Sequence, residues 1–233
     1  MRYLLALILC SVLESQNVFA ANPAYETPEE PLPEKQNALN IETATQREIW
    51  QLIPTLSVIS PREFTLSKDG YSIPYGKNLT GLPALYVGAN RSLGSRPFGR
   101  GSLEFFSLAR LGYSFKDTPM TLGERTARVK LHWVPMEGGL ETRFRLADFP
   151  YIRPSLTVGG GVHWLYQSGE FTSINASFWV PHVFVSPAIS FFESSDPTDW
   201  FGGFTFGVTY QHSFASRQTV RAWSFDLGMA IIL

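Results

Sequence analysis

The chain has 233 residues, of which 44% are hydrophobic, 14% aromatic and only 17% charged, and its formal net charge is −1. The near-zero charge argues against a general nucleic-acid binder, which would show a basic surplus, and the hydrophobic content argues against wholesale disorder. An average globular domain is roughly 25% charged, and beyond residue 101 the only lysines are Lys116 and Lys130. This scarcity predicts a surface that does not face water.

Residues 1–20 have the pattern of a secretory signal peptide. A basic second residue precedes an apolar run over 3–13, and Ala20 supplies a small residue at the cleavage position. The run is too short to span a bilayer, so we expect cleavage after Ala20; the alternative is a short N-terminal membrane anchor. Lipid attachment at Cys10 is rejected because Leu9 precedes it where a small residue is needed, and the mature chain would contain no cysteine for a disulfide.

Residues 21–53 are predicted to form an acidic, Pro-rich linker followed by a possible short helix. Four prolines alternate with four glutamates over 21–40, which is typical of an extended, disordered tether; docking of a partner is the alternative. The helix would cover 41–53. No second apolar run of about 18 residues follows, so no helical membrane span is expected in the mature chain.

Alternation of apolar and polar residues begins near residue 82 and continues to the C-terminus. Because successive side chains of a strand point to opposite faces, each segment has one apolar and one polar face. Turn-like sequences separate the segments, and Glu137-Gly138-Gly139 is predicted to be one of these turns. Residues 54–81 are predicted to be an irregular lead-in or to add two strands, which would make ten. The eight predicted strands of the barrel at 82–233 lie near 82–90, 102–115, 123–135, 140–147, 152–167, 177–192, 200–211 and 222–233.

Periodicity alone does not say which face is inside. A soluble lipocalin-like barrel buries its apolar face, whereas an outer-membrane barrel turns that face to lipid. The polar faces consist mostly of Gly, Ser and Thr with sparse charges, as a crowded lumen requires, and several strands exceed the usual 5–6 residues. The sequence therefore predicts an all-β, antiparallel, up-and-down transmembrane β-barrel of eight strands.

Aromatic residues near the strand ends are predicted to form two girdles at the membrane interfaces. If the strand direction alternates from residue 82 onwards, the residues of one rim are Trp133, Tyr166, Trp179, Tyr210 and Trp223, and those of the other are Tyr113, Phe115, Phe191 and Trp200.

The C-terminal strand ends the chain with a polar residue, a glycine and apolar residues at the last and third-last positions, namely Asp226, Gly228, Ile231 and Leu233. This pattern resembles the terminal signal by which the barrel-assembly machinery recognises outer-membrane proteins, although that signal usually ends in an aromatic residue. Together with the alternation, it makes residues 82–233 similar to the small bacterial outer-membrane barrels of the OmpA and OmpX type. The resemblance implies an outer-membrane location, with membrane lipids and the assembly machinery as partners.

Charged side chains on the polar faces are expected to pair, because a narrow eight-stranded lumen holds side chains but hardly any bulk water. Their basic excess would make an open lumen weakly anion-selective, but structural pairing is favoured. The predicted lumen network comprises Glu104, Arg110, Arg128, Lys130, Glu141, Arg143, Arg145, Arg153 and Asp226.

Three histidines, His132, His163 and His182, also fall on the polar faces near one rim, where a metal or pH-sensitive site is conceivable. Lumen filling is the favoured role, and no metal or other cofactor is predicted. No nucleophile, phosphate-loop or metal-site motif occurs.

The leading interpretation is therefore a non-enzymatic barrel of structural, envelope-integrity or narrow-pore type, with no nucleic-acid partner. One alternative is a soluble periplasmic binding barrel. Another is an outer-membrane enzyme that modifies lipid A, for which His212 and Ser213 are the nearest pairing.

Overall fold

The computed structural model describes residues 50–68, 71–76, 79, 81–122, 125–149, 151–169, 175–191, 200–215 and 218–233. The chain divides into two units, 1–45 and 46–233, and every described residue belongs to the second. The predicted signal peptide, the linker and residues 41–49 of the predicted helix lie outside the described residues. Among those described, no helix is both long and apolar enough to cross a membrane.

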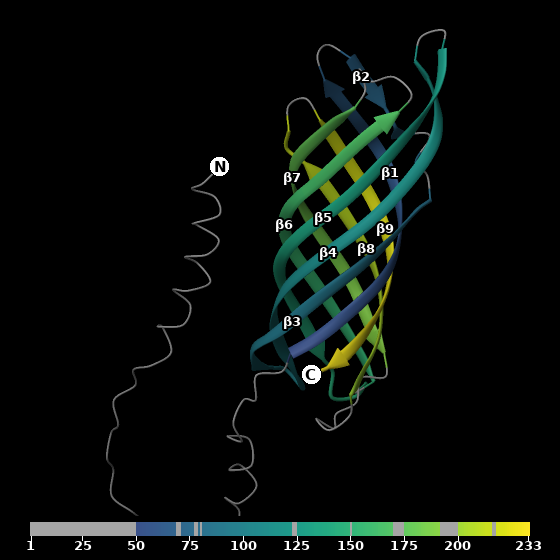
Figure 1. The fold of residues 1–233 in the computed structure, drawn as a ribbon. Helices are drawn as coiled ribbons and strands as arrows, with labels where there is room; N and C mark the ends of the chain where they lie inside the picture. Colours follow the sequence, from purple (N-terminus) through teal and green to yellow (C-terminus); the bar gives the residue numbers. More distant parts are fainter. Residues whose placement is uncertain are drawn as a thin grey trace, which may run out of the picture. The chain divides into compact units, whose positions relative to one another are not determined.

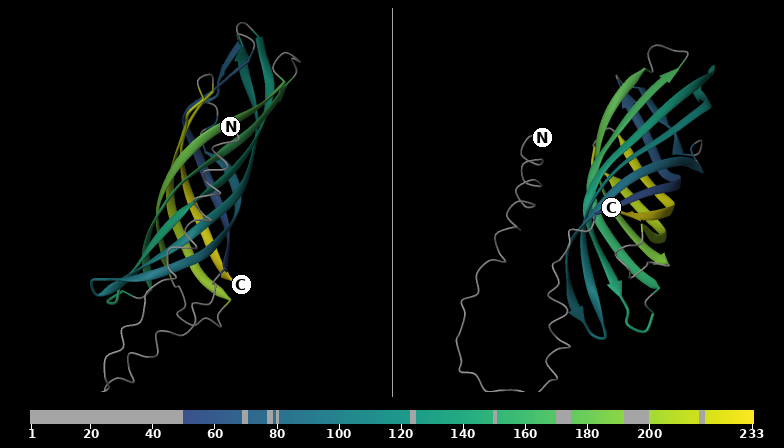
Figure 2. Two further views of the ribbon diagram at one scale, coloured as in Figure 1. Left: turned by 90° about the vertical axis from the view of Figure 1, so that its left-hand side faces the viewer. Right: turned by 60° about the horizontal axis from the view of Figure 1, so that its bottom comes forward.

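Eight antiparallel strands close into a barrel (Figures 1 and 2). Neighbours in sequence are neighbours in the sheet, and β9 pairs back with β1 to close it. The short β2 pairs only with the end of β1, as a hairpin beside the barrel. The prediction of an up-and-down barrel of eight strands is confirmed. The strands are β1 (Trp50–Lys68), β2 (Tyr71–Pro74), β3 (Leu82–Phe98), β4 (Gly101–Leu122), β5 (Arg125–Arg145), β6 (Ile152–Gly169), β7 (Ala176–Phe191), β8 (Phe201–Ser213) and β9 (Thr219–Ile232).

The barrel has the predicted number of strands, but two of the strands are not the predicted segments. The barrel begins at Trp50 rather than near residue 82, so Trp50 and Ile53 lie in a strand and not in a helix. The predicted strands at 123–135 and 140–147 are one strand, β5. Gly138 and Gly139 were expected to form a turn, but they pair with Gly160 and Gly159 of β6.

These glycines permit a close approach of two backbones. A Cβ atom at Gly139 would lie 2.6 Å from the carbonyl oxygen of Val158. Glycine inside a strand often marks such an approach, and here it was mistaken for a turn signal because the same residue type serves both purposes.

The two ends of the barrel are distinguished by what they hold. Trp50 and Ile232 lie at one end, the terminal end, and the β1–β2 hairpin lies at the other, the hairpin end (Figure 1). The halves of the barrel next to these ends are called the terminal half and the hairpin half. β4 and β5 are 22 and 21 residues long. At about 3.3 Å per residue and a tilt near 45°, such strands extend about 50 Å along the barrel axis, which is twice the roughly 25 Å apolar band of an outer-membrane barrel.

A β-bulge between Pro61 and Glu63 changes which side chains of β1 point inward. Before it, Ser57 and Ile59 are buried, and after it the buried positions are Phe64 and Leu66. An extra residue on one strand shifts the alternation by one position, so the bulge places a large aromatic ring inside the hairpin half.

Candidate functional site: the barrel interior and its outer belt

The interior of the hairpin half is an apolar core, which we call the plug. Phe64 lies at its centre, with ring centroids 5.3 Å from both Tyr75 and Trp133. The Tyr75 hydroxyl donates a hydrogen bond of 2.8 Å to Oε1 of Gln167, and burial raises the pKa of this phenol above its ordinary value. The plug consists of Ile59, Phe64, Leu66, Ile73, Tyr75, Leu79, Leu82, Ala84, Tyr86, Met120, Val129, Leu131, Trp133, Leu165, Ala176, Phe178, Val180, Val220 and Ala222.

The apolar row of β5 changes sides along the strand. In the hairpin half Val129, Leu131 and Trp133 point inward and are at most 1% exposed, whereas in the terminal half Leu140 points outward and is 56% exposed. The prediction that 127–133 forms part of the outer apolar face is therefore wrong. The register of β5 with both neighbouring strands is constant along its length. The apolar side chains therefore change from the inner to the outer face because the sequence pattern changes, and not because the backbone contains a bulge.

The interior of the terminal half is polar, and its most enclosed charge is Glu137. This carboxylate is fully buried and forms an ion pair with Nε of Arg110. Nε2 of His182 lies 3.0 Å from its Oε1, and Nε2 of Gln211 donates to the same oxygen at 2.9 Å. The Arg110 guanidinium also lies over the rings of Tyr86 and Phe184, at 5.2 and 4.7 Å.

Glu137 was missed by sequence reasoning because it was assigned to a turn. The signal that identifies it is positional: it has the same parity as Glu141 and Arg143, which were recognised as inward-facing. Reading β5 as one continuous strand would have placed all three in the lumen.

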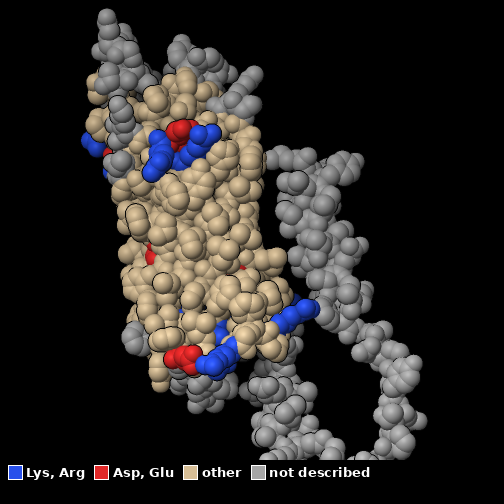
Figure 3. Space-filling model, turned by 180° about the vertical axis from the view of Figure 1, so that it is seen from behind, with Lys and Arg blue, Asp and Glu red and all other residues tan. Residues whose placement is uncertain are grey.

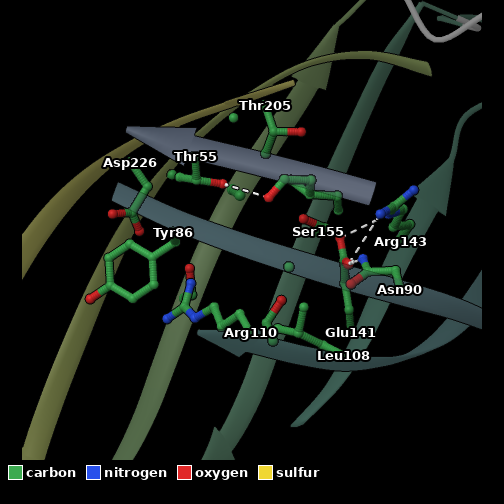
Figure 4. A pocket seen from close by; sticks show the side chains of 17 residues that line it. Thr55, Tyr86, Asn90, Leu108, Arg110, Glu141, Arg143, Ser155, Thr205 and Asp226 are labelled. Carbon is green, nitrogen blue, oxygen red and sulfur yellow. Dashed lines mark hydrogen bonds and ion pairs between the residues drawn. The ribbon is translucent and has the colours of Figure 1, made fainter. Parts of the chain in front are cut away.

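A second network surrounds Glu141. Arg143 donates from Nε to its Oε1 at 2.8 Å and from Nη1 to Gln51 at 2.8 Å, while Nδ2 of Asn90 donates to Oε2 of Glu141 at 2.5 Å. Figure 4 shows Asn90 of β3 beside Glu141 and Arg143 of β5. Such mutual pairing is what buried charges require, because each unpaired ion would carry a desolvation cost of several kcal/mol.

The remaining predicted acids of the lumen are also partnered. Arg153 pairs with Glu104 at 3.4 Å. Asp226 accepts hydrogen bonds from the hydroxyls of Ser57 at 2.6 Å and Thr209 at 2.5 Å. A cavity of about 70 Å³ is lined by Arg110 of the first network, by Glu141 and Arg143 of the second, and by Asp226.

Three members of the predicted lumen network lie elsewhere. Arg128, Lys130 and Arg145 are exposed, and Arg128 pairs with Asp117 on the outside at 3.2 Å. Among the described residues of the polar interior, three arginines form ion pairs, namely Arg110, Arg143 and Arg153. The same interior holds four carboxylates, because Glu137 joins Glu104, Glu141 and Asp226. The predicted basic excess is therefore wrong, because Arg128 and Lys130 lie on the outer face of β5, Arg145 is exposed at the end of that strand, and Glu137 was not counted.

Two of the three histidines meet inside the barrel. The rings of His163 and His182 stack with centroids 3.7 Å apart and an angle of 7°, and Nε1 of Trp133 donates to Nδ1 of His163 at 3.0 Å. His132 points outward instead, and its Nδ1 lies 3.0 Å from the Tyr113 hydroxyl. The favoured role of lumen filling is thus confirmed for His163 and His182 and wrong for His132, so the alternative three-histidine rim site does not form. The described residues contain no group of three or more metal-ligating side chains.

His212 and Ser213 do not form a nucleophile and base pair. Ser213 is buried, accepts a hydrogen bond from the Val220 N–H at 2.7 Å and donates to the Gln218 carbonyl at 3.3 Å. The His212 ring lies on the other face, 5.5 Å from Phe214. Adjacent strand residues point apart, so these side chains lack the hydrogen-bond geometry of a nucleophile and base.

The outside of the terminal half is an apolar belt. Seen from behind, Lys, Arg, Asp and Glu gather near the two ends, and the middle is almost free of them (Figure 3). The exposed side chains of this belt include Leu56, Val58, Leu85, Val87, Leu111, Leu140, Leu156, Val158, Val183, Val185, Ile189, Phe204, Phe206, Phe225 and Leu227.

Aromatic side chains flank the belt, with two corrections to the prediction. Trp133 is buried in the plug and belongs to neither girdle. Tyr113 and Phe115 lie beside His132, which also neighbours Tyr166, and so they share the hairpin-side rim instead of the opposite one. That rim comprises Tyr113, Phe115, Tyr166, Trp179, Tyr210 and Trp223, and Phe191 and Trp200 lie towards the terminal end as predicted.

The residues of the predicted assembly signal lie where β9 joins β1. Asp226 faces inward, and Leu233 is exposed, with its N–H bonded to the Trp50 carbonyl at 3.0 Å. Ile231 pairs with Leu52 on β1. A Cβ atom at Gly228 would lie 3.1 Å from Oγ1 of Thr55, so the glycine permits close packing at the seam. Recognition by the assembly machinery stays a prediction.

No family model and no curated protein sequence matches this chain. Among solved structures, it is similar to Ail, the attachment invasion locus protein of Yersinia pestis, with a TM-score of 0.45, 10% identity, and 81% of this chain and 100% of that one covered. It is also similar to Neisserial surface protein A, with a TM-score of 0.42, 9% identity, and coverage of 79% and 96%. A third is the outer membrane enzyme PagL, with a TM-score of 0.43, 12% identity, and coverage of 76% and 97%. At these values the likenesses assign no function.

Proposed function

We propose that this protein is a bacterial outer-membrane barrel with a closed lumen, which serves an envelope-structural role rather than transport. The observation that supports this most directly is the inversion of polarity along the barrel axis. In the terminal half apolar side chains point outward and charges pair inside, while in the hairpin half the core is inside and Arg128 and Lys130 are outside.

The inversion matches a barrel that is partly in lipid and partly in water. A lipid-facing wall must be apolar, and charges on it are costly, whereas a wall in water must bury its apolar side. β4 and β5 are about twice as long as the membrane band requires. The hairpin half therefore projects beyond the bilayer as a water-exposed extension with its own core.

A soluble binding barrel fits less well. Such a barrel would present a polar outer wall along its whole length. Here the terminal half exposes large side chains such as Leu140, Phe206 and Phe225 in one continuous belt. An exposed apolar surface of that kind marks an interaction with a membrane or a partner.

The plug argues against a narrow pore. Phe64 of β1 and Trp133 of β5 pack together across the lumen in the hairpin half, within a cluster of buried apolar side chains. Where the polar zone begins, Glu137 of β5 reaches across to His182 of β7 and Gln211 of β8. These lumen contacts therefore serve to keep the barrel rigid and to hold its strands in register.

Two measurements test the proposal. The full chain, expressed in a Gram-negative host, is expected in the outer-membrane fraction and to migrate differently in gels before and after boiling, because a closed barrel resists detergent unfolding. Reconstituted in planar bilayers, it is expected to show no stepwise conductance. A soluble, heat-insensitive protein would overturn the membrane assignment, and steady single-channel steps would overturn the closed lumen.

A further inference from the structure

The plug and the polar interior of the barrel meet at a stack of two histidine rings. The rings of His163 and His182 have centroids 3.7 Å apart, and both side chains are buried. Nε1 of Trp133 connects His163 to the plug through a hydrogen bond of 3.0 Å. Nε2 of His182 lies 3.0 Å from Oε1 of Glu137 in the polar interior. The two halves of the lumen are therefore in contact through this stack, which we call the histidine junction.

The hydrogen bonds of the two rings differ in what they allow. The indole N–H of Trp133 can only donate, so Nδ1 of His163 accepts from it and carries no proton, which makes His163 neutral. Nε2 of His182 faces the Glu137 carboxylate and is therefore the protonated nitrogen of that ring. Nδ1 of His182 has no hydrogen-bond partner among the described residues. A second proton on His182, taken from water by the lone pair of Nδ1, would make this ring a cation beside a carboxylate.

The geometry of the stack favours one charged ring. Two neutral aromatic rings prefer an offset or edge-to-face arrangement over a direct sandwich, because their electron-rich faces repel each other. A cation is instead attracted to the face of an aromatic ring. The planes of His163 and His182 are only 7° from parallel at a centroid distance of 3.7 Å, so the rings lie face to face. A positive charge on His182 would make this contact attractive.

The charges of the polar interior point to the same ring. Among the described residues there, three arginines stand against four carboxylates, which leaves one negative charge in excess. An uncompensated charge in an enclosed interior is costly. A protonated His182 supplies the fourth positive charge, and it does so in contact with Glu137, whose side chain is fully buried.

His182 is the group of its surroundings that is suited to gain a charge. Arg110 is already a cation, and His163 must stay neutral to accept from Trp133. Histidine is also the side chain whose ordinary titration lies closest to neutrality. The charged, titratable and amide groups packed around His182 and Glu137 come from six other strands and are Tyr86 of β3, Arg110 of β4, Glu137 of β5, His163 of β6, Gln211 of β8 and Asp226 of β9.

We propose that His182 is a proton-binding site of the folded barrel and that its protonation tightens the histidine junction. With the proton bound, the imidazolium of His182 pairs with Glu137 and attracts the face of His163. When the proton leaves at alkaline pH, the interior keeps one surplus negative charge and two neutral rings lie face to face. The contact between the plug and the polar interior is then weaker. This proposal is independent of the membrane location.

Nitrogen NMR of the histidine rings tests the site directly. The full chain, labelled with nitrogen-15 in its histidines, is folded into detergent micelles and measured at about pH 7.5, where a histidine with an ordinary pKa near 6.5 is only about one-tenth protonated. We expect the two ring nitrogens of His182 to have the nearly equal shifts of an imidazolium, and His163 to show one protonated and one unprotonated nitrogen. His182→Gln identifies the His182 signals by their loss. A neutral His182 ring in this spectrum would overturn the proposal.

Two carboxylate variants test whether Glu137 holds the proton on His182. Glu137→Gln is expected to abolish the imidazolium signal of His182. Glu63→Gln makes the same chemical change in the exposed pair with Arg221 and is expected to leave the signal in place. An imidazolium that persists in Glu137→Gln would overturn the assigned partner. The spectrum of the unaltered chain decides the proposal even if Glu137→Gln does not fold.

Urea unfolding at several pH values tests the effect on the junction. The folded chain keeps a proton on His182 that the unfolded histidine releases above about pH 6.5, so the equilibrium constant for unfolding is expected to rise with pH, by up to about tenfold per pH unit. Between about pH 7 and pH 8.5, His182→Gln is expected to lack this rise, whereas His212→Gln, which alters a histidine on the outer face, keeps it. An equal rise in the unaltered chain and in His182→Gln would overturn the tightening of the junction.

Discussion

Neutralising Glu137 is expected to destabilise the barrel more than any comparable change on its surface. In Glu137→Gln the side chain keeps its shape, but the Arg110 guanidinium loses its counter-ion while only 13% exposed. Removing one partner of a buried ion pair typically costs about 3–5 kcal/mol. The rings of Tyr86 and Phe184 retain some favourable contact with the cation, so we expect a loss near the lower limit, about 3 kcal/mol.

The matched control is Glu63→Gln. Glu63 pairs with Arg221 on the outside, where the two side chains are 54% and 43% exposed, and an exposed pair contributes about 0–1 kcal/mol. Both variants are folded into lipid vesicles and unfolded in urea, with tryptophan fluorescence and gel mobility as readouts. Replacing both partners, as Arg110→Met with Glu137→Leu, is expected to recover part of the loss. The reasoning is refuted if Glu137→Gln costs no more than Glu63→Gln.

Three further predictions concern the belt, the plug and the Tyr75 hydroxyl. Leu140→Arg is expected to cost about 2–4 kcal/mol in vesicles, as a charge near the bilayer midplane does, whereas Lys130→Leu should stay within about 0.5 kcal/mol; equal losses in urea titrations would argue against the lipid-facing belt. Trp133→Ala should cost about 3–5 kcal/mol by leaving a cavity, and a change below 1 kcal/mol in the same titration would count against a packed plug. The raised pKa of Tyr75 stabilises the fold below the ordinary phenol pKa, and this contribution is lost as pH rises above about 10, because the unfolded phenol then ionises first. The alkaline decline of the unfolding free energy should therefore be shallower in Tyr75→Phe, and identical slopes would contradict this.

The inward and outward faces of most strands could be predicted from the sequence alone. On β6 to β9 the alternation assigned His163, His182 and Asp226 to the interior and Trp179 to the exterior, and all four lie there. Alternation determines these faces because a strand has a side-chain period of two. It also predicted the closed eight-stranded topology, since short connections between successive strands lead to neighbouring pairing.

Which face lies inside along the whole height of the barrel was decided only by the tertiary structure. Leu131 and Leu140 are both apolar residues of one strand, yet one lies in the plug and the other in the outer belt. Periodicity gives relative sides and carries no information about whether lipid or water surrounds a given level. The same limit hid Glu137 and misplaced Arg128 and Lys130, because the glycine pair at 138–139 is read as a turn until the neighbouring strand is seen to pack against it.

The low charge and scarce lysine of the sequence by themselves predicted a surface that does not face water. The structure located that part in the terminal half, as one belt above which the chain reverts to an ordinary water-facing exterior with an apolar core. The physical reason is that composition sums over all environments, whereas burial depends on the height of each residue along the barrel, which only the pairing of the strands determines.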